Sequence, residues 1–363
     1  MKKLLSLVII LAASSAFATR ARINALGNAA HLTDTATIPG NVSDLMALPD
    51  SLTIETGKTA AASSTAGTVG DDGAEATLIR SMGDAKVGLI LGHDNKRTAR
   101  YRTEILSGTN VDLQQNPIFL IYGMKMGEMN VAGGLEYSNY NNKTSSIKEN
   151  TTNLNLAAST QMWAAAVELG LADKWESATQ TVKGKTNASV YGSFNISPEL
   201  FSYAKLEMFG YELTGTTARE ITENNMEVGA VHTMKKEGSE FFYGLSLRSE
   251  SKKNSTTSGT PTETKTTALK LPVIIGVEAD AASWLTLRGS ITQTVLINDS
   301  KEETDATTTS EKSPGDNNTT VAFGTGLKFG KLSLDGTILT GGGQALNFGT
   351  GNFMSQVGLT YNF

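Results

Sequence analysis

The chain has 363 residues but no cysteine, only seven prolines, three histidines and three tryptophans. Without cysteine it can form no disulfide framework, thiol active site or zinc–thiolate site. Hydrophobic residues make up 39% of the chain, and no stretch after residue 18 approaches the roughly 20 apolar residues of a membrane-spanning helix. No basic stripe is present, so we expect no nucleic-acid partner. These absences exclude a disulfide-stabilised secreted domain and a helical membrane protein.

The first 18 residues have the pattern of a secretory signal peptide. Lys2 and Lys3 precede an apolar run over 4–13, and Ala16-Phe17-Ala18 forms an A-x-A cleavage pattern. A first transmembrane helix is the alternative, but the run is too short and no stop-transfer charges follow it. Cleavage after Ala18 would remove both lysines and change the formal charge from −5 to −7.

Glycine and alternating apolar positions are what the chain has in abundance. There are 36 glycines, and strand-like windows of period two recur from residue 51 to the end. In "VAFGTGLKF", for example, Val321, Phe323 and Leu327 share one parity while Ala322 and Gly324 share the other. The last window, "SQVGLTYNF", keeps this alternation up to the final residue. One apolar face on every strand is compatible with a soluble sandwich or a membrane barrel, and the connections must decide between them.

Short and long connections alternate along the chain. Seven short turns are expected near 83–84, 127–128, 161–162, 197–199, 235–238, 280–283 and 330–331. Eight long polar loops are expected near 58–74, 93–116, 140–152, 173–186, 214–224, 251–265, 298–318 and 340–352. They join 16 strands, or 14 if the first windows fail. We therefore predict an all-β fold, a transmembrane antiparallel up-and-down β-barrel over 51–363 with short periplasmic turns and long extracellular loops.

Aromatic residues and the C-terminal strand agree with a barrel in lipid. Indole and phenol rings favour the headgroup level, which predicts two girdles that include Trp163, Trp175, Trp284, Tyr137 and Tyr361. A terminal Phe363, preceded at every second position by Tyr361, Leu359 and Val357, resembles the assembly signal of bacterial outer-membrane β-barrel proteins. That resemblance implies export to the outer membrane of a Gram-negative bacterium and recognition by the barrel-assembly machinery.

A second resemblance lies in residues 19–50. A basic residue followed by A-L-G, and L-P-D leading into a strand, resemble the start of porin-like barrels such as the major outer-membrane proteins of predatory bacteria. Those proteins often carry Asn-Pro-Ala where this chain has Ile38-Pro39-Gly40-Asn41. The resemblance implies that 19–50 packs at the periplasmic mouth or inside the barrel; a mobile leader is the alternative.

Few residues could carry enzyme chemistry. His31 precedes the barrel, His93 begins a long loop beside Asp94, and His232 has lipid-facing parity. The glycine-rich segments lack the spacing of a phosphate loop, and "GDD" and "SPGDNN" lack calcium-loop spacing. We therefore expect no enzyme activity, no metal site and no cofactor.

The expected function is that of a porin, which lets small hydrophilic solutes diffuse with weak ion selectivity. A barrel of this size leaves an aqueous lumen, whose charges would be mixed in sign: Lys86, Lys125, Glu136, Glu168, Glu227, Arg248, Lys270, Glu278 and Lys328. If a loop constricts the pore, we expect it to be 93–116 through Arg97, Arg100, Arg102 and Glu104. The alternative is that these arginines bind lipopolysaccharide phosphates outside.

Other functions remain open at this point: a plugged or lipid-handling barrel that transports hydrophobic ligands, a lipid-enclosing oligomer, and a structural surface protein. We expect outer-membrane lipid and lipopolysaccharide as partners and a homo-oligomer by analogy with porins. Several lumen-parity stretches carry only small residues, such as Gly88, Gly324 and Gly326. We favour the interpretation that water wets them; the alternative is an apolar occupant, namely the N-terminal segment, a neighbouring subunit or lipid.

Overall fold

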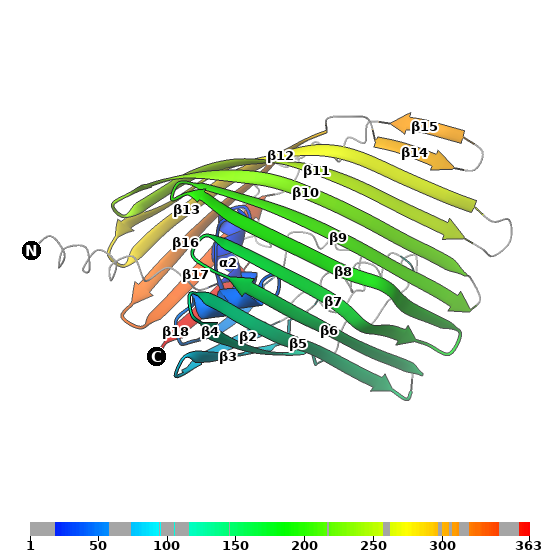
Figure 1. Ribbon diagram of the computed structural model, residues 1–363, viewed down its shortest axis with the longest axis horizontal. Helices are drawn as coiled ribbons and strands as arrows, with labels where there is room; N and C mark the ends of the chain where they lie inside the picture. Colours follow the sequence, from blue (N-terminus) through cyan, green and yellow to red (C-terminus); the bar gives the residue numbers. More distant parts are fainter. Residues whose placement is uncertain are drawn as a thin grey trace, which may run out of the picture.

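The computed structural model describes residues 19–57, 74–93, 95, 105, 116–144, 146–215, 218–256, 262–296, 300–304, 307–311, 319–340 and 356–363. Within these residues, 16 strands pair in chain order into one closed antiparallel barrel (Figure 1). They are β1 (Ser51–Gly57), β2 (Ala74–Met82), β3 (Ala85–Leu91), β4 (Ile118–Met126), β5 (Met129–Asn142), β6 (Ile147–Ser159), β7 (Trp163–Glu176), β8 (Gln180–Ser197), β9 (Leu200–Gly215), β10 (Arg219–Lys236), β11 (Ser239–Thr256), β12 (Thr262–Ala282), β13 (Leu285–Leu296), β16 (Thr319–Phe329), β17 (Leu332–Thr340) and β18 (Gln356–Asn362).

The C-terminal strand closes the barrel. β18 pairs with β17 on one side and with β1 on the other, in a register that places Tyr361 opposite Leu52 and Leu359 opposite Ile54. The amide of Phe363 donates to the carbonyl of Asp50 at 3.1 Å. Among the described strands, no edge of the barrel sheet is left open to lipid, where an unpaired backbone group would cost several kcal/mol. The predicted fold class and the count of 16 strands are therefore confirmed.

The seven short turns lie where the sequence predicts them, but four of the predicted long loops are wrong. Strands continue through most of 140–152, 173–186, 214–224 and 251–265, which leaves connections of only a few residues. These segments are polar but rich in Thr, Ser and Asn. Each finds a neighbouring strand that pairs its backbone, so it extends the sheet instead of remaining irregular. The strands β8, β10, β11 and β12 are consequently the longest, at 18 to 21 residues.

One further hairpin lies at the long-loop end, within the predicted loop 298–318. It consists of β14 (Ser300–Thr304) and β15 (Thr307–Glu311), and β14 pairs with the start of β12 (Figure 1). The main barrel bypasses this hairpin, because β13 pairs directly with β16.

The outer surface carries an apolar belt, while the lumen faces are polar or filled. Alternation along β5 illustrates this: Leu135 and Tyr137 are exposed, whereas Ala132, Glu136 and Ser138 are buried inside the barrel. Of the predicted girdle residues, Trp163, Trp284, Tyr137 and Tyr361 are exposed on the outside. Among the described residues, no helix has the length and apolar character required to cross a membrane.

Trp175 departs from the predicted girdle. It is 4% exposed and faces the lumen. The pairing of β6 with β7 shifts register between Thr152 and Asn153, so that Ala172 and Gly170 face consecutive partners. One extra residue in β7 reverses the faces of all positions beyond it. The parity that holds at Trp163 is therefore inverted at Trp175.

Candidate functional site: the plugged lumen

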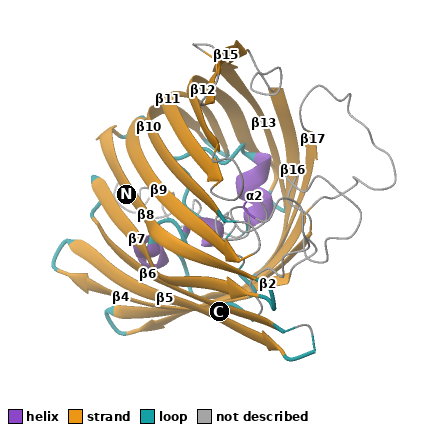
Figure 2. Ribbon diagram, turned by 90° about the vertical axis from the view of Figure 1, so that its right-hand side faces the viewer, coloured by secondary structure: helices purple, strands orange, loops and turns teal. Residues whose placement is uncertain are grey.

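Residues 19–50 form a plug inside the barrel (Figure 2). The plug contains the helix α2 (Arg20–Ala25) and the 3-10 turns η1 (Thr35–Thr37) and η2 (Val42–Met46). Thr19, Asp34 and Asn41 cap these three elements, each through a side-chain oxygen that accepts a backbone amide. Local capping fixes short helical turns that would be marginal by themselves.

Two apolar clusters attach the plug to the wall. Near the β2–β8 side, Ile38, Val42, Leu45 and Leu48 pack against a group of wall residues that includes Ile79, Ile90, Phe119 and Ile121. On the opposite side, Ile23, Leu26, Ala29 and Leu32 pack with Val231 and Phe242. Burial of apolar area on both sides stabilises the docked plug at roughly 25 cal/mol per Å².

Glycine in the wall makes room for the plug. A Cβ atom at Gly324 would lie 2.4 Å from the Cβ of Ala25, and one at Gly358 would lie 2.5 Å from the Cβ of Thr19. At Gly88 the nearest atom is the Cδ1 of Leu45, at 3.0 Å. The interpretation favoured from sequence, that water wets the small-residue wall, is therefore wrong at Gly88 and Gly324. They face the N-terminal segment.

A buried ion network holds the N-terminal part of the plug. Arg22 pairs with Glu278 at 2.9 Å and with Asp34 at 3.2 Å. Arg288 of the wall pairs with Glu278 at 2.6 Å and also with Asp335. Burial raises the pKa of Asp34 to about 6, an effect that its contact with Arg22 opposes.

A second ionic contact lies beside the first. Arg20 pairs with Glu75 at 2.6 Å, and His93 also approaches Glu75, with 2.9 Å between Nδ1 and the carboxylate. The backbone amide of Arg20 donates to Glu55. These contacts attach the first turn of α2 to β1 and β2.

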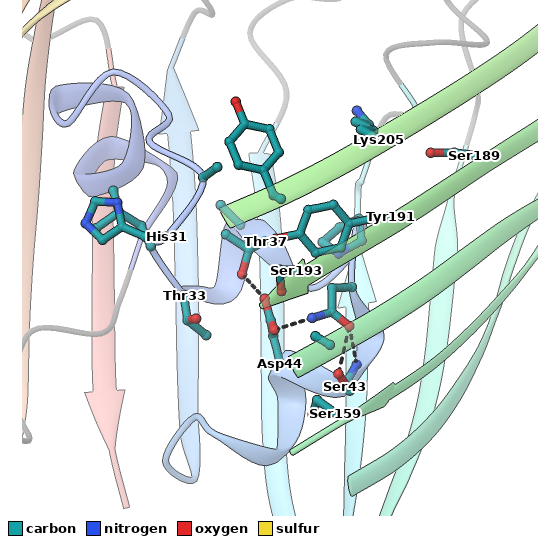
Figure 3. Close-up of a pocket in the computed structure, with 18 of the residues that line it drawn as sticks. His31, Thr33, Thr37, Ser43, Asp44, Ser159, Ser189, Tyr191, Ser193 and Lys205 are labelled. Carbon is teal, nitrogen blue, oxygen red and sulfur yellow. Dashed lines mark hydrogen bonds between the residues drawn. The ribbon is translucent and has the colours of Figure 1, made fainter. Parts of the chain in front are cut away.

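Asp44 organises the turn between η1 and η2 (Figure 3). The Thr37 hydroxyl donates to one of its oxygens at 2.5 Å, and the Asn41 amide donates to the other at 2.6 Å. Asn41 also accepts from the Ser43 hydroxyl at 2.7 Å. Burial raises the pKa of Asp44 to about 6, while these two neutral donors oppose the rise.

A cavity of about 1060 Å³ remains between the plug and one side of the barrel. Tyr191, Ser193 and Lys205 reach it from the wall, opposite Thr37 and Asp44 of the plug (Figure 3). Charged groups of both signs line it: Arg20, Asp44, Lys125, Glu128, Glu136, Glu168, Lys205, Glu207, Glu227 and Arg248. The lining extends along β9 from Phe201, near the short-turn end, to Phe209. We call the lumen face formed by Tyr191, Tyr203, Lys205, Glu207, Glu227 and Arg248 the open wall.

Several open-wall side chains pair with one another. The Tyr203 hydroxyl donates to Glu227 at 2.6 Å, and Lys205 pairs with Glu207 at 2.7 Å. The side chain of Lys205 is nevertheless 42% exposed. These groups keep access to water, unlike the buried ions beneath the plug.

An apolar cluster lies in the lumen above the cavity, near the long-loop end. It is formed by Trp175, Val182, Phe209, Tyr211, Leu213 and Ile221, and Ile105 packs against it with no exposed surface. The Asn95 amide donates to Glu136 on β5 at 3.3 Å and to Glu168 on β7 at 3.2 Å. Two residues from the connection between β3 and β4 therefore reach the interior. The predicted constriction residues Arg97, Arg100, Arg102 and Glu104 lie outside the described residues.

The predicted lumen charges occupy three settings. Lys125, Glu136, Glu168, Glu227 and Arg248 line the cavity. Lys86 donates to the carbonyl of Leu48 in the plug, and Glu278 belongs to the buried ion network. Lys270 pairs with Glu250 at 2.8 Å and Lys328 with Asp280 at 3.2 Å, on lumen-parity positions away from the cavity.

Sequence reasoning missed the partners that hold the plug. Arg20, Arg22, Glu55, Arg288 and Asp335 were not identified as functional. Lumen parity on the adjacent strands β12 and β13 would have grouped Arg288 with Glu278, whereas Asp335 lies on β17, with β16 between. Nothing local in the sequence pairs them with the plug, because the contacts join positions more than 250 residues apart.

The histidines occupy separate places. His31, in the plug, lies 2.9 Å from Glu240 and packs edge-on against Phe242. His232 stacks on the exposed Tyr243 at the outer surface, with ring centroids 5.2 Å apart. Within the described part of the chain, no group of three or more His, Asp or Glu side chains is arranged to hold a metal ion.

Neither a protein-family model nor a curated protein sequence matches this chain. Solved structures with a similar fold include the CymD monoaromatic hydrocarbon channel (TM-score 0.44, 10% identity, covering 96% of this chain and 99% of that one). The Pseudomonas putida toluene transporter TodX gives a TM-score of 0.41 at 11% identity, over 96% and 99% of the two chains. The Acinetobacter baumannii outer-membrane channel DcaP gives 0.40 at 10%, over 86% and 95%. Similarity at this level bears on neither solute nor mechanism.

Proposed function

We propose that this protein is a channel of the bacterial outer membrane that lets small hydrophilic solutes diffuse past a lumenal plug. The observation that carries this proposal is the cavity of about 1060 Å³ beside the plug, lined by charged groups of both signs. Such a lining hydrates polar solutes and favours neither anions nor cations strongly. The barrel has no enzymatic role in this proposal, and its surroundings are outer-membrane lipid and lipopolysaccharide.

The decisive measurement compares conductance and sugar uptake. Purified protein in planar bilayers should give small, steady single-channel currents with weak selectivity, and liposomes that contain it should swell in a small sugar. Deletion of 20–48 should raise the conductance because it empties the lumen. Absence of both current and swelling in the intact protein would refute the diffusion channel.

Substitution of the arginines in 93–116 tests the predicted constriction. Replacement of Arg97, Arg100 and Arg102 by Ser should raise conductance if those side chains narrow the path. The matched control is Lys143→Ser, which neutralises a cation in the connection between β5 and β6. An unchanged conductance in the triple variant would remove the constriction and favour a role outside the pore.

A second candidate function, uptake of small apolar solutes, is favoured by the apolar lumen cluster around Trp175. Six wall side chains and Ile105 form a buried apolar cluster near the long-loop end. Trp163→Phe with Trp284→Phe leaves Trp175 as the single tryptophan, since the chain has three, and excitation at its red edge avoids the tyrosines. Saturable change of its emission by a small arene, but not by a sugar, would support this function. A matched variant that keeps only Trp284, which faces outward, controls for partition into detergent.

A further inference from the structure

Glu55 is a buried carboxylate that forms no ion pair with any other described residue. It lies on the lumen face of β1 and is 8% exposed. Among the described residues its hydrogen-bond donor is the backbone amide of Arg20, and no Lys, Arg or His side chain forms an ion pair with it. The side chain of Arg20 pairs instead with Glu75. A buried charge without a counterion is strongly unfavourable.

The surroundings of Glu55 contain more acid than base. Five carboxylates converge around the first turn of α2, those of Asp34, Glu55, Glu75, Glu278 and Asp335. Three guanidinium groups face them, from Arg20, Arg22 and Arg288, together with the His93 ring. A further positive charge in this region would make the number of basic groups equal to the number of carboxylates.

Thr19 is positioned to supply that charge. It has no exposed surface, and its hydroxyl donates to Asp335 at 3.2 Å. The residue that follows it donates its amide to Glu55, so the nitrogen of Thr19 lies one peptide unit away, a Cα spacing of about 3.8 Å. In the sequence, Thr19 is the first residue after the Ala16-Phe17-Ala18 cleavage pattern.

We propose that the α-ammonium group of Thr19, released when the signal peptide is removed, is the counterion of Glu55 and locks the plug into the barrel. Hydrolysis of the bond between Ala18 and Thr19 consumes one water. It leaves a carboxylate on Ala18 and an ammonium group on Thr19 at neutral pH. Before cleavage the same nitrogen is an uncharged amide, so the plug docks fully only in the processed chain.

A double-mutant cycle tests this pairing in the exported protein. One extra Ala between Ala18 and Thr19 keeps the cleavage pattern but moves the new ammonium group by one residue. Glu55→Gln keeps the acceptor for the Arg20 amide and removes the charge. Docking is read from the rate at which a thiol reagent labels Ser43→Cys, a buried plug position in a chain that has no other cysteine.

We expect the insertion to accelerate labelling at least tenfold when Glu55 is present and less than about twofold in Glu55→Gln, since the two changes remove one interaction. Equal acceleration in both backgrounds would assign the effect to sterics and overturn the pairing. No acceleration in either would show that the ammonium group does not hold the plug.

A measurement without any substitution gives an independent result. Periodate oxidises an N-terminal threonine, because it bears adjacent amine and hydroxyl groups, and mass spectrometry of the N-terminal peptide follows the reaction. In the folded protein, we expect oxidation at least tenfold slower than in urea. A first residue other than Thr19, or equal rates in both conditions, would overturn the proposal even if every variant failed to fold.

Discussion

The plug-covered part of the lumen and the open wall differ in what their side chains contact. Under the plug, the wall presents glycine, aliphatic residues and buried charged groups, such as Gly324, Ile121 and Arg288. The open wall presents Tyr203, Lys205 and Arg248, which keep access to water. Both faces belong to one barrel and share one alternation. The difference shows that lumen composition follows the local occupant, protein in one case and solvent in the other.

Removal of the occupant should have the largest effect. Deletion of 20–48 exposes the covered wall to water and widens the path, so we expect single-channel conductance to rise severalfold in a barrel of this size. Thermal unfolding of the deletion variant, followed by the β-strand signal in circular dichroism, should show that the barrel persists. A conductance equal to that of the intact protein would mean that the plug does not limit the pore.

Replacement of an arginine should cost much more stability on the covered wall than on the open wall. Arg288→Ala leaves Asp335 buried without its cation and removes one of the two arginines that pair with Glu278, at a cost of about 3–5 kcal/mol. Arg248→Ala breaks a half-exposed pair with Glu250, where the side chain is 36% exposed, and should cost at most about 1 kcal/mol. Accessibility of Ser43→Cys, or denaturant unfolding of the plug, measures both. Similar costs would contradict the distinction between the walls.

The replacement of a glycine by a larger residue should weaken docking on the covered wall but not on the outer surface. Gly324→Val places atoms against Ala25 and should weaken docking by about 1–3 kcal/mol, with a labelling rate at Ser43→Cys about 10- to 100-fold faster. Gly192→Val is the matched control, because a Cβ there meets nothing closer than 3.9 Å. Equal rates in the two variants would show that the plug does not lie against Gly324 in the membrane.

Acidification should modestly stabilise the docked state of the plug. The pKa of Asp44 is about 6 in the docked plug against an ordinary value of 3.8, so the docked state binds the proton more strongly than the released one. Docking therefore gains stability as the pH falls through 6 and loses it as the pH rises, by about 1 kcal/mol. Plug-open events in single-channel records should become rarer at pH 5 than at pH 8.

Asp44→Asn tests the origin of this pH effect. The amide retains an acceptor for Asn41 and a polar contact to Thr37, but it cannot ionise. The variant at pH 8 should resemble the native protein at pH 5. Asp50→Asn provides the control, since hydrogen bonds from Ser81 lower the pKa of Asp50 despite its partial burial. An unaltered pH response in Asp44→Asn would move the effect to Asp34.

The strands show which features of the fold could be predicted from local sequence pattern. Alternation and turn chemistry predicted β1 to β3 and all seven short turns, because each depends on residues close in sequence. The polar strand extensions were missed, since a Thr-rich segment forms a strand only when a neighbour pairs it. Trp175 was placed on the wrong face because a bulge, whose position depends on the register between β6 and β7, reverses parity.

The sequence by itself determined the barrel, because period-two alternation and a C-terminal strand that ends on Phe363 are local properties. Only the tertiary structure decided what fills the lumen. Arg22 meets Glu278 and Thr19 meets Asp335 across more than 250 residues, and closure of β1 on β18 creates the space in which they meet. Contacts between such distant positions depend on strand register and barrel curvature, which no short stretch of sequence specifies.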